Sequence, residues 1–292
     1  MTRDCLESVY CNAGALSCEV IVVDNNSQDG SLNMIAGEFP DVILIANHAN
    51  LGFAAANNQG LAVAKGECQL LLNSDTIIIG DVLEKSVVFL KMNHQVGAMG
   101  CQVLNTDGSI QPTCSGFPTL FRLTEMTLAL DRIPGLSFLD TYLMRHWKRD
   151  SEREVEVVSG CYLMFRKTVL EQVGGLDERF FFFAEETDWC RRAREAGLKL
   201  YFSPVGQIVH HGGGSVKKLS YKRDVMLTAA TVRLHRKYGG IPAALMVYFV
   251  LMLFNVSRLL MWGLYSLKSK NFSCKAKHFR NVVKSHRACW PD

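Results

Sequence analysis

The chain has 292 residues, of which 48% are hydrophobic and 21% are charged, and its net charge is +4. This composition predicts a sizeable core, in one large domain or one domain with an appendage. The charge excess is too small to indicate nucleic acid, so we expect no such partner. The ten cysteines show no paired metal-binding spacing, and the N-terminus lacks an apolar leader, so we expect reduced, buried thiols in a cytoplasmic protein without a signal peptide.

Short apolar runs alternate with helical patterns in the first third of the chain. This alternation predicts an α/β fold with a mostly parallel sheet flanked by helices. In such sheets ligands bind at the carboxyl ends of the strands. We expect strands at Glu19–Val23, Val42–Ala46, Gln69–Leu72 and Gly97–Val103, and helices at Ser31–Glu38, Phe53–Ala64 and Asp81–Met92.

The pattern is weaker between Thr106 and Arg149, where three prolines interrupt it, and we expect turns and irregular helix there. Regular elements return after this segment. We expect strands at Val155–Arg166 and Leu198–Ser203, and helices at Val169–Val173 and Glu185–Ala196.

A long apolar stretch, Ile241–Leu267, contains Arg258 as its one charged residue. Its uninterrupted part, up to Phe254, is too short to span a bilayer, while the whole stretch is long enough. We expect a membrane-associating helix that lies in or re-enters the interface of an anionic membrane. A spanning helix and a buried helix or dimer contact are the alternatives. The basic residues that follow the stretch are Lys268, Lys270, Lys275, Lys277, Arg280, Lys284 and Arg287.

Two aspartates, Asp24 and Asp75, each follow an apolar run at an expected strand end. Asp24 either caps the N–H groups of its own turn or hydrogen-bonds a base or ribose. Asp75 either caps the next segment or holds Mg²⁺ or Mn²⁺, ions that take oxygen ligands and bridge phosphates. The chain has no phosphate-binding P-loop and no GxGxxG motif, which speaks against NTPases and dinucleotide enzymes.

Three carboxylates, Glu185, Glu186 and Asp188, directly follow a run of four phenylalanines. Acids beside an apolar wall have raised pKa values and can act as bases near neutral pH. On a helix Glu185 and Asp188 share a face, and Glu186 lies about 100° round. One acid can pair with Arg191 or Arg192 while another faces a site. The alternative is a solvated charged face.

Two histidines, His210 and His211, precede a Gly-Gly-Gly-Ser run that ends at Ser215. Either imidazole can be a metal ligand or a donor to phosphate. The alternative is an ordinary pair of histidines near a surface turn.

The order of five motifs resembles the family 2 inverting glycosyltransferases of the GT-A fold, and the bacterial rhamnosyltransferase-like members in particular. The resemblance covers residues 4–215. It implies a GT-A (Rossmann-like) domain over residues 1–215 and a helical region over residues 216–292, with the membrane-associating segment at 241–267. The motifs are EVIVVDNNSQDGS, NLGFAAANNQG, LLLNSDT, VSGCYLMFRKTVLEQVGGLDERFFFFAEETDWCRRAREAG and VHHGGGS.

The resemblance also implies a role for each matching residue. Glu186 matches the catalytic base, within a Glu185–Glu186 pair where the family usually has Glu-Asp. Asp75 matches the last acid of the DXD motif, with His210 or His211 completing the shell of a divalent cation, Mn²⁺ or Mg²⁺. The first acid of that motif is replaced by Asn73. The residues implied to bind the nucleotide sugar are Asp24, Asn25, Asn26, Gly52, Phe53, Asn57, Asn73 and Asp75.

The implied reaction moves a sugar, rhamnose in the resembling members, from a dTDP- or UDP-linked donor to a hydroxyl. The implied acceptor is a glycan or a polyprenyl-linked sugar in cell-surface polysaccharide synthesis. The protein would then be peripheral on the inner face of the cytoplasmic membrane. A non-catalytic relative that binds membrane or a partner enzyme is the main alternative, and a glycosidase or nucleotidyltransferase is another.

The start of the chain departs from the family pattern. The family begins with a strand of the type VSVIIVTYN, which forms part of the nucleotide pocket, whereas this chain begins with MTRDCLESV. We therefore expect the sequence either to start late or to lack this strand, with weaker contacts to the base in the second case.

Overall fold

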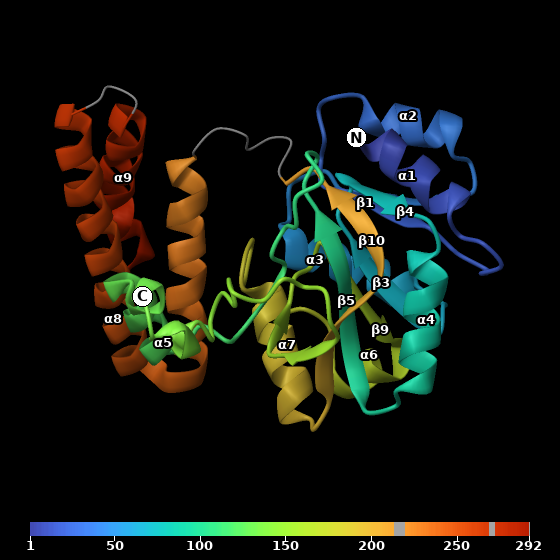
Figure 1. The fold of residues 1–292 in the computed structure, drawn as a ribbon. Coiled ribbons are helices and arrows are strands. Elements are labelled where there is room, and N and C mark those ends of the chain that lie inside the picture. The colour runs from blue at the N-terminus through green and yellow to red at the C-terminus, as the bar shows by residue number, and fades with distance from the viewer. Residues whose placement is uncertain (213–219, 269–271, 292) are drawn as a thin grey trace. The chain divides into compact units, whose positions relative to one another are not determined.

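A computed structural model describes residues 1–212, 220–268 and 272–291 (Figure 1). The end of the histidine motif at Ser215 and the basic residue Lys270 lie outside the described residues. The chain divides into two compact units, which we describe separately. The sheet unit comprises Met1–Phe117, Leu143–Phe181 and Glu185–Gly214, and the helical unit comprises Pro118–Tyr142, Phe182–Ala184 and Ser215–Asp292.

The sheet unit is built on a six-stranded sheet in which β3, β9, β5, β10 and β4 lie side by side in that order, and β7 also pairs with β10. Among the described residues β1 pairs with β2 alone, in parallel, and β6 pairs with β8. The strands are β1 Ile21–Asp24, β2 Ile43–Ala46, β3 Cys68–Leu72, β4 Thr76–Ile79, β5 Val96–Leu104, β6 Cys114–Ser115, β7 Arg153–Val155, β8 Val157–Val158, β9 Tyr162–Arg166 and β10 Lys199–His210.

The α/β prediction is confirmed, but the sheet is mixed rather than mostly parallel. Only the β1–β2 and β5–β10 pairs are parallel, and the other pairs between described strands are antiparallel. Strand β9 accounts for part of the difference, because it runs antiparallel to both of its neighbours, β3 and β5. The sequence prediction also missed β4 and joined β7, β8 and β9 into one strand.

Helices cover the sheet and form most of the helical unit (Figure 1). The predicted helices of the sheet unit are confirmed to within two residues at each end. The helices are α1 Thr2–Cys11, α2 Ser31–Glu38, α3 Phe53–Val63, α4 Val82–Met92, α5 Leu120–Leu128, α6 Lys167–Val173, α7 Glu185–Glu195, α8 Tyr221–Lys268 and α9 Ser273–Ser285.

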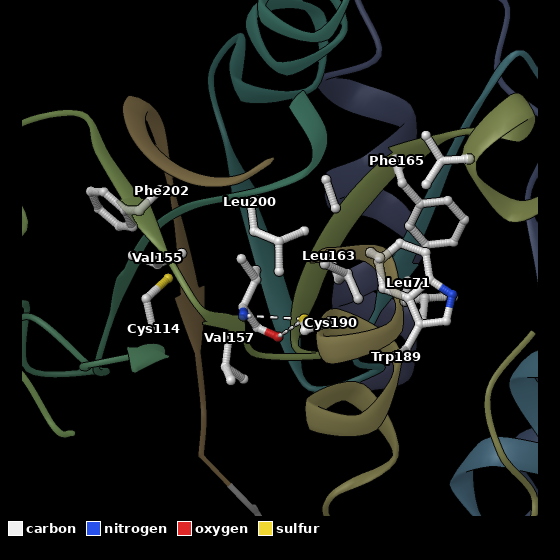
Figure 2. Close-up of a cluster of buried hydrophobic side chains, with 14 of the residues drawn as sticks. Leu71, Cys114, Val155, Val157, Leu163, Phe165, Trp189, Cys190, Leu200 and Phe202 are labelled. Carbon is white, nitrogen blue, oxygen red and sulfur yellow. Dashed lines mark hydrogen bonds between the residues drawn. The ribbon is translucent and has the colours of Figure 1, made fainter. Parts of the chain in front are cut away.

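A cluster of buried hydrophobic side chains fixes α7 against the sheet (Figure 2). Trp189 is 1% exposed and its ring lies 4.8 Å from that of Phe165 on β9. Cys190, on the same helix, accepts a hydrogen bond at its Sγ from the backbone N–H of Val158, at 3.5 Å. Loss of a buried tryptophan side chain costs about 3–5 kcal/mol. This packing therefore determines where the first turn of α7, with its acidic residues, is placed.

The helical unit is organised around α8, which bends at Gly240. Gly240 has φ 67° and ψ −167°, a left-handed conformation that favours glycine, and it separates a helix over 221–239 from one over 241–268. Helices α5 and α9 and the 3₁₀ turn His286–Cys289 pack against α8. Among the described residues α8 is the one helix long and apolar enough to cross a membrane, by length and composition. The sequence prediction of a long apolar helix is confirmed.

Candidate functional site

The ends of β3 and β10 bring three of the predicted residues together. The register of the β4–β10 pair sets His210 opposite Thr76, beside the turn that contains Asn73 and Asp75. The Nε2 atom of His210 lies 3.1 Å from Oδ1 of Asp75 and 3.1 Å from Nδ2 of Asn73. The side chains of His210 and Asp75 are largely buried, so the cluster is a defined polar site rather than a solvated surface.

The other nitrogen of His210 is held by Gln111, which the sequence did not single out. Nδ1 lies 2.6 Å from Oε1 of Gln111, and Nε2 of Gln111 donates to Oδ1 of Asn105 at 2.8 Å. An amide oxygen only accepts, so Nδ1 carries a proton toward Gln111, and Nε2 is the nitrogen that faces Asp75 and Asn73. A neutral imidazole with this orientation would place its Nε2 lone pair and the Asp75 carboxylate where both could bind one cation.

These donors fit a divalent cation. Asp75 offers a carboxylate and His210 an imidazole, a mixed oxygen and nitrogen set that suits Mn²⁺ better than Mg²⁺, which prefers oxygen ligands. The described part of the chain contains no group of three or more His, Cys, Asp or Glu residues that could hold a metal. His211 reaches the cluster through its backbone, whose N–H donates to the carbonyl of Asp75 at 2.9 Å.

The acid pair at the start of α7 is buried and incompletely hydrogen-bonded. Glu185 is 4% exposed, and within the described residues Oε2 of both Glu185 and Glu186 lacks a hydrogen-bond partner. Burial, followed by repulsion from Glu186, raises the pKa of Glu185 to about 9. Burial also raises the pKa of Glu186. Two close carboxyls of this kind cannot both ionise easily, so Glu185 keeps its proton at neutral pH.

The third acid of the same turn has a structural role. Asp188 is fully buried and accepts a hydrogen bond from Nε of Arg192 at 2.9 Å. Arg192 also donates to the carbonyls of Val173 and Gly175, which ties α7 to the end of α6. The expected ion pair with a neighbouring arginine is thus Asp188–Arg192.

One turn between β8 and β9 contacts both clusters. The backbone N–H of Asn73 donates to the carbonyl of Cys161 at 3.3 Å. A Cβ at Gly160 would lie 3.3 Å from the ring of Phe53 and 3.9 Å from Cβ of Glu186, so a larger residue would crowd both. Burial raises the pKa of the Cys161 thiol to about 11, and the charges of Glu186 and Asp75 act in the same direction. The thiol is therefore inert, and the turn places the two acidic clusters side by side.

A third group of predicted residues meets at the N-terminus of α3. Nδ2 of Asn25 donates to the carbonyl of Gly52 at 3.0 Å. Gly52 has φ 89°, and a Cβ there would lie 2.5 Å from the carbonyl oxygen of Phe181, so the close approach requires glycine. The N–H of Phe53 donates to the same carbonyl at 2.8 Å. Asn25, Gly52 and Phe53 are thus one contiguous group, next to Gly160.

The remaining predicted residues make local contacts. Asp24 is buried and accepts a hydrogen bond from the N–H of Ser27 at 2.9 Å, as a turn cap does. Asn26 is exposed and bonded to the side chain of Gln28. Nδ2 of Asn57 donates to the carbonyl of Phe53 within α3, at 2.8 Å.

Sequence reasoning missed four residues of the site: Gln111, Gly160, Cys161 and Phe181. Gly160 and Cys161 belong to the VSGCY motif, and Phe181 belongs to the aromatic run, so each carried a usable signal. Gln111 lies in the proline-interrupted segment, which has no periodicity that could have indicated its role.

Comparison with protein families and curated proteins gives consistent matches. The model of glycosyl transferase family 2 matches residues 1–174. The N-acetylglucosaminyl-diphospho-decaprenol L-rhamnosyltransferase of Mycobacterium tuberculosis is 28% identical over 203 residues, 66% of each chain. The low-salt glycan biosynthesis hexosyltransferase Agl10 of Haloferax volcanii is 28% identical over 66% of this chain and 59% of its own. The chain thus matches about two thirds or less of these relatives' lengths. The matches do not favour a non-catalytic relative.

Comparison with solved structures identifies the fold. The mannosyltransferase PcManGT of Pyrobaculum calidifontis, in complex with GDP-Man and Mn²⁺, matches 98% of this chain and 82% of its own, with a TM-score of 0.58 and 16% identity. TarS of S. aureus matches 98% of this chain and 87% of its own, with a TM-score of 0.51 and 14% identity. These likenesses confirm the GT-A fold.

Proposed function

We propose a glycosyl-transfer function for this chain, which belongs to glycosyl transferase family 2. In this proposal the protein is an inverting transferase that moves a sugar from a nucleoside diphosphate donor to an acceptor hydroxyl, in the synthesis of a cell-surface glycan. The observation that carries the proposal is the Gly160–Cys161 turn. It contacts Asn73, which lies beside Asp75 and His210, on one side and lies against Glu186 on the other, so the proposed cation ligands and the proposed base would border one bound donor.

Glu186 is the base of the proposed reaction. Its carboxylate takes the proton of the acceptor hydroxyl, and the oxygen attacks the anomeric carbon from the face opposite the diphosphate. The bond between that carbon and the diphosphate oxygen breaks, and the configuration inverts. The buried setting raises the pKa of Glu186 and makes it a stronger base than an exposed glutamate. Glu185 remains protonated beside it, which avoids a second negative charge.

Asp75 and His210 are the proposed ligands of a divalent cation, with Asn73 beside them. When bound, such a cation would offset the negative charge of the leaving diphosphate. Gln111 fixes the tautomer and ring orientation of His210. His211 takes part only through its backbone in this proposal.

Asp24, Asn25, Gly52 and Phe53 are the proposed contacts to the nucleotide sugar. They adjoin Gly160, so the donor would extend from the N-terminus of α3 to the acid pair.

The names of the relatives suggest the substrates and the location. The mycobacterial relative is named for rhamnosyl transfer to a decaprenol-linked sugar, and the Shigella flexneri relative RfbF for dTDP-rhamnose. By analogy we favour a dTDP- or UDP-linked donor, a polyprenyl-linked or glycan acceptor, and a location on the inner face of the cytoplasmic membrane.

Calorimetric titration of the protein with UDP, dTDP and GDP, each with and without Mn²⁺, tests the donor class. We expect one nucleotide to bind, and to bind more tightly with Mn²⁺. The matching nucleotide sugar should then be consumed when a polyprenyl-linked acceptor is present, and NMR of the product should show an inverted anomeric centre. Absence of nucleotide binding under all conditions, or retention of configuration, would refute the proposal.

A further inference from the structure

The part of α8 beyond Gly240 presents an apolar stripe on the exterior of the helical unit. The stripe residues are separated by steps of three, four or seven, so they fall within about 60° of the helix circumference. A helix that faces water carries polar side chains on this side. The stripe is Met246, Phe249, Leu253, Leu260, Leu264 and Leu267, whose exposed fractions range from 49% to 84%.

The opposite side of the same helix is packed inside the unit. Ala244, Val247 and Tyr248 are buried there, and the imidazole Nε2 of buried His286 lies 3.2 Å from the carbonyl oxygen of Tyr248. Helix α8 is therefore one member of a bundle and not an isolated span. A spanning α8 would carry α9, which packs along it, into hydrocarbon together with its basic residues, which is unfavourable.

Charge is strongly segregated along the chain. Residues 216–292 contain fifteen Lys and Arg against two acids, a net charge of +13, whereas residues 1–215 contain seventeen against twenty-six, a net charge of −9. On α9 the exposed cations recur with helical spacing and share one face. These cations are Lys277, Arg280 and Lys284, followed by Arg287 in the adjoining 3₁₀ turn. Such a surface complements anionic lipid headgroups.

Aromatic residues gather where α8 approaches α9. The ring of Trp262 lies 5.5 Å from that of Phe272 and 5.8 Å from that of Tyr265, and Nζ of Lys275 lies 4.2 Å from the centre of the Trp262 ring. Tryptophan and tyrosine with adjacent lysine are typical of the headgroup level of a membrane.

We propose that the helical unit binds in the plane of an anionic leaflet, with the α8 stripe at the acyl boundary and the basic residues among the headgroups. The stripe supplies apolar contact and the cations supply the preference for anionic lipid. Membrane binding itself does not depend on the proposed function. Its biological role does rest on that function, because the leaflet would be the surface on which the enzyme meets its acceptor.

Co-sedimentation of the full chain with preformed vesicles tests the proposal, in the absence of donor and acceptor. We expect reversible binding to vesicles of phosphatidylcholine with phosphatidylglycerol, little binding to phosphatidylcholine alone, and release by high salt. The triple variant Phe249→Ser, Leu253→Ser, Leu260→Ser should bind more than about tenfold more weakly. The matched control, Val63→Ser, Val88→Ser, Met92→Ser, removes exposed apolar side chains of the sheet unit and should bind normally.

A second variant separates the electrostatic contribution. Lys277→Glu, Arg280→Glu, Lys284→Glu should weaken binding to the anionic vesicles by about a hundredfold. Binding that is unchanged in both variants, or that resists salt like an integral protein, would overturn the proposal. A stripe variant that loses a dimer in light scattering without any change in vesicle binding would assign the stripe to a second copy. Because no substrate is used, these results stand whether or not glycosyl transfer is detected.

Discussion

Asp75 lies at a strand end with the imidazole of His210 at 3.1 Å, whereas Glu185 and Glu186 begin α7 with one oxygen each that has no hydrogen-bond partner in the described part of the chain. Both regions are acidic and largely buried, and both border the Gly160–Cys161 turn. They differ in what surrounds the carboxyl groups. A buried carboxyl oxygen without a hydrogen-bond partner favours the protonated form, and burial raises the pKa of both Glu185 and Glu186. Asp75 instead lies beside a second possible metal ligand, His210. The first region therefore suits a cation and the second suits proton transfer.

Asp188 shows that this difference does not depend on burial alone. It lies one turn along α7 from Glu185 and is fully buried, yet Arg192 donates to it at 2.9 Å. Helix α7 thus contains both kinds of carboxyl within four residues. Substitutions that exchange or remove these partners test whether the assignment of roles is correct.

The largest effect is expected from Glu186→Gln. The glutamine amide cannot take up the proton of the substrate hydroxyl that receives the sugar, so kcat should fall by about 10²–10⁴-fold. Nucleotide affinity should not change, because the group does not contact the proposed diphosphate site. The measurement is steady-state transfer together with calorimetric nucleotide binding. Glu195→Gln, at the exposed end of the same helix, is the matched control and should leave kcat unaffected. A Glu186→Gln variant with normal kcat would remove Glu186 from the base role.

Asp188→Asn should act on stability instead. It leaves the Arg192 guanidinium without its buried counter-charge, which costs about 3 kcal/mol. Denaturant unfolding followed by circular dichroism measures the loss. Removal of the exposed Arg191–Glu195 pair by Glu195→Gln should cost less than about 0.5 kcal/mol. The activity of folded Asp188→Asn should stay close to normal, and a selective loss of kcat would indicate a catalytic role that we do not assign.

Glu185→Gln should stabilise the protein. The pKa of Glu185 is about 9 in the folded state and near its ordinary value when unfolded, so folding takes up a proton between these values. Glu185 therefore favours folding fully only at low pH, and this contribution is lost as pH rises toward about 9. Glutamine does not titrate, so the variant should gain about 2 kcal/mol near pH 7 and little at pH 5. Thermal unfolding of the variant and the unaltered protein at pH 7 and pH 5 measures this gain in stability. An equal gain at both pH values would contradict the raised pKa of Glu185.

The sequence supported much of the fold because strand and helix patterns are local. Five helices of the sheet unit (α2, α3, α4, α6 and α7), the strand ends at Asp24 and Asp75 and the long apolar helix were predicted, whereas α1 was not. Strand β4 was missed because its short run, which follows directly after the Asn73–Asp75 turn, does not show its antiparallel partner β10. The direction of β9 between β3 and β5 likewise depends on long-range pairing, which no local pattern encodes.

The site was predictable only in part, for a related reason. Motif order indicated Asp75, His210 and Glu186, but their contacts depend on strand register and on the packing of α7. Whether a carboxyl keeps its hydrogen bonds is set by neighbours far away in sequence, as the contrast between Asp188 and Glu185 shows. The support that Gln111 gives to His210 spans 99 residues, so composition and spacing could not reveal it.

Substitution of Gln111 should have the smallest effect, and it tests the Asp75–His210 region specifically. Gln111→Leu removes the acceptor at Nδ1 of His210, so the ring can turn or change tautomer, and Mn²⁺ affinity should fall about tenfold. Gln111→Glu keeps an acceptor at this place and should retain the affinity. Calorimetric titration of Mn²⁺ in the presence of the preferred nucleoside diphosphate measures both, independently of turnover. The control variant is Gln207→Leu, which removes the side-chain amide of a β10 residue that bonds Gln102 instead of His210. It should not change Mn²⁺ binding. Equal Mn²⁺ affinity in Gln111→Leu and the unaltered protein would show that His210 needs no support from Gln111, and the contrast between the two acidic regions would then depend on Asp75 and His210 alone.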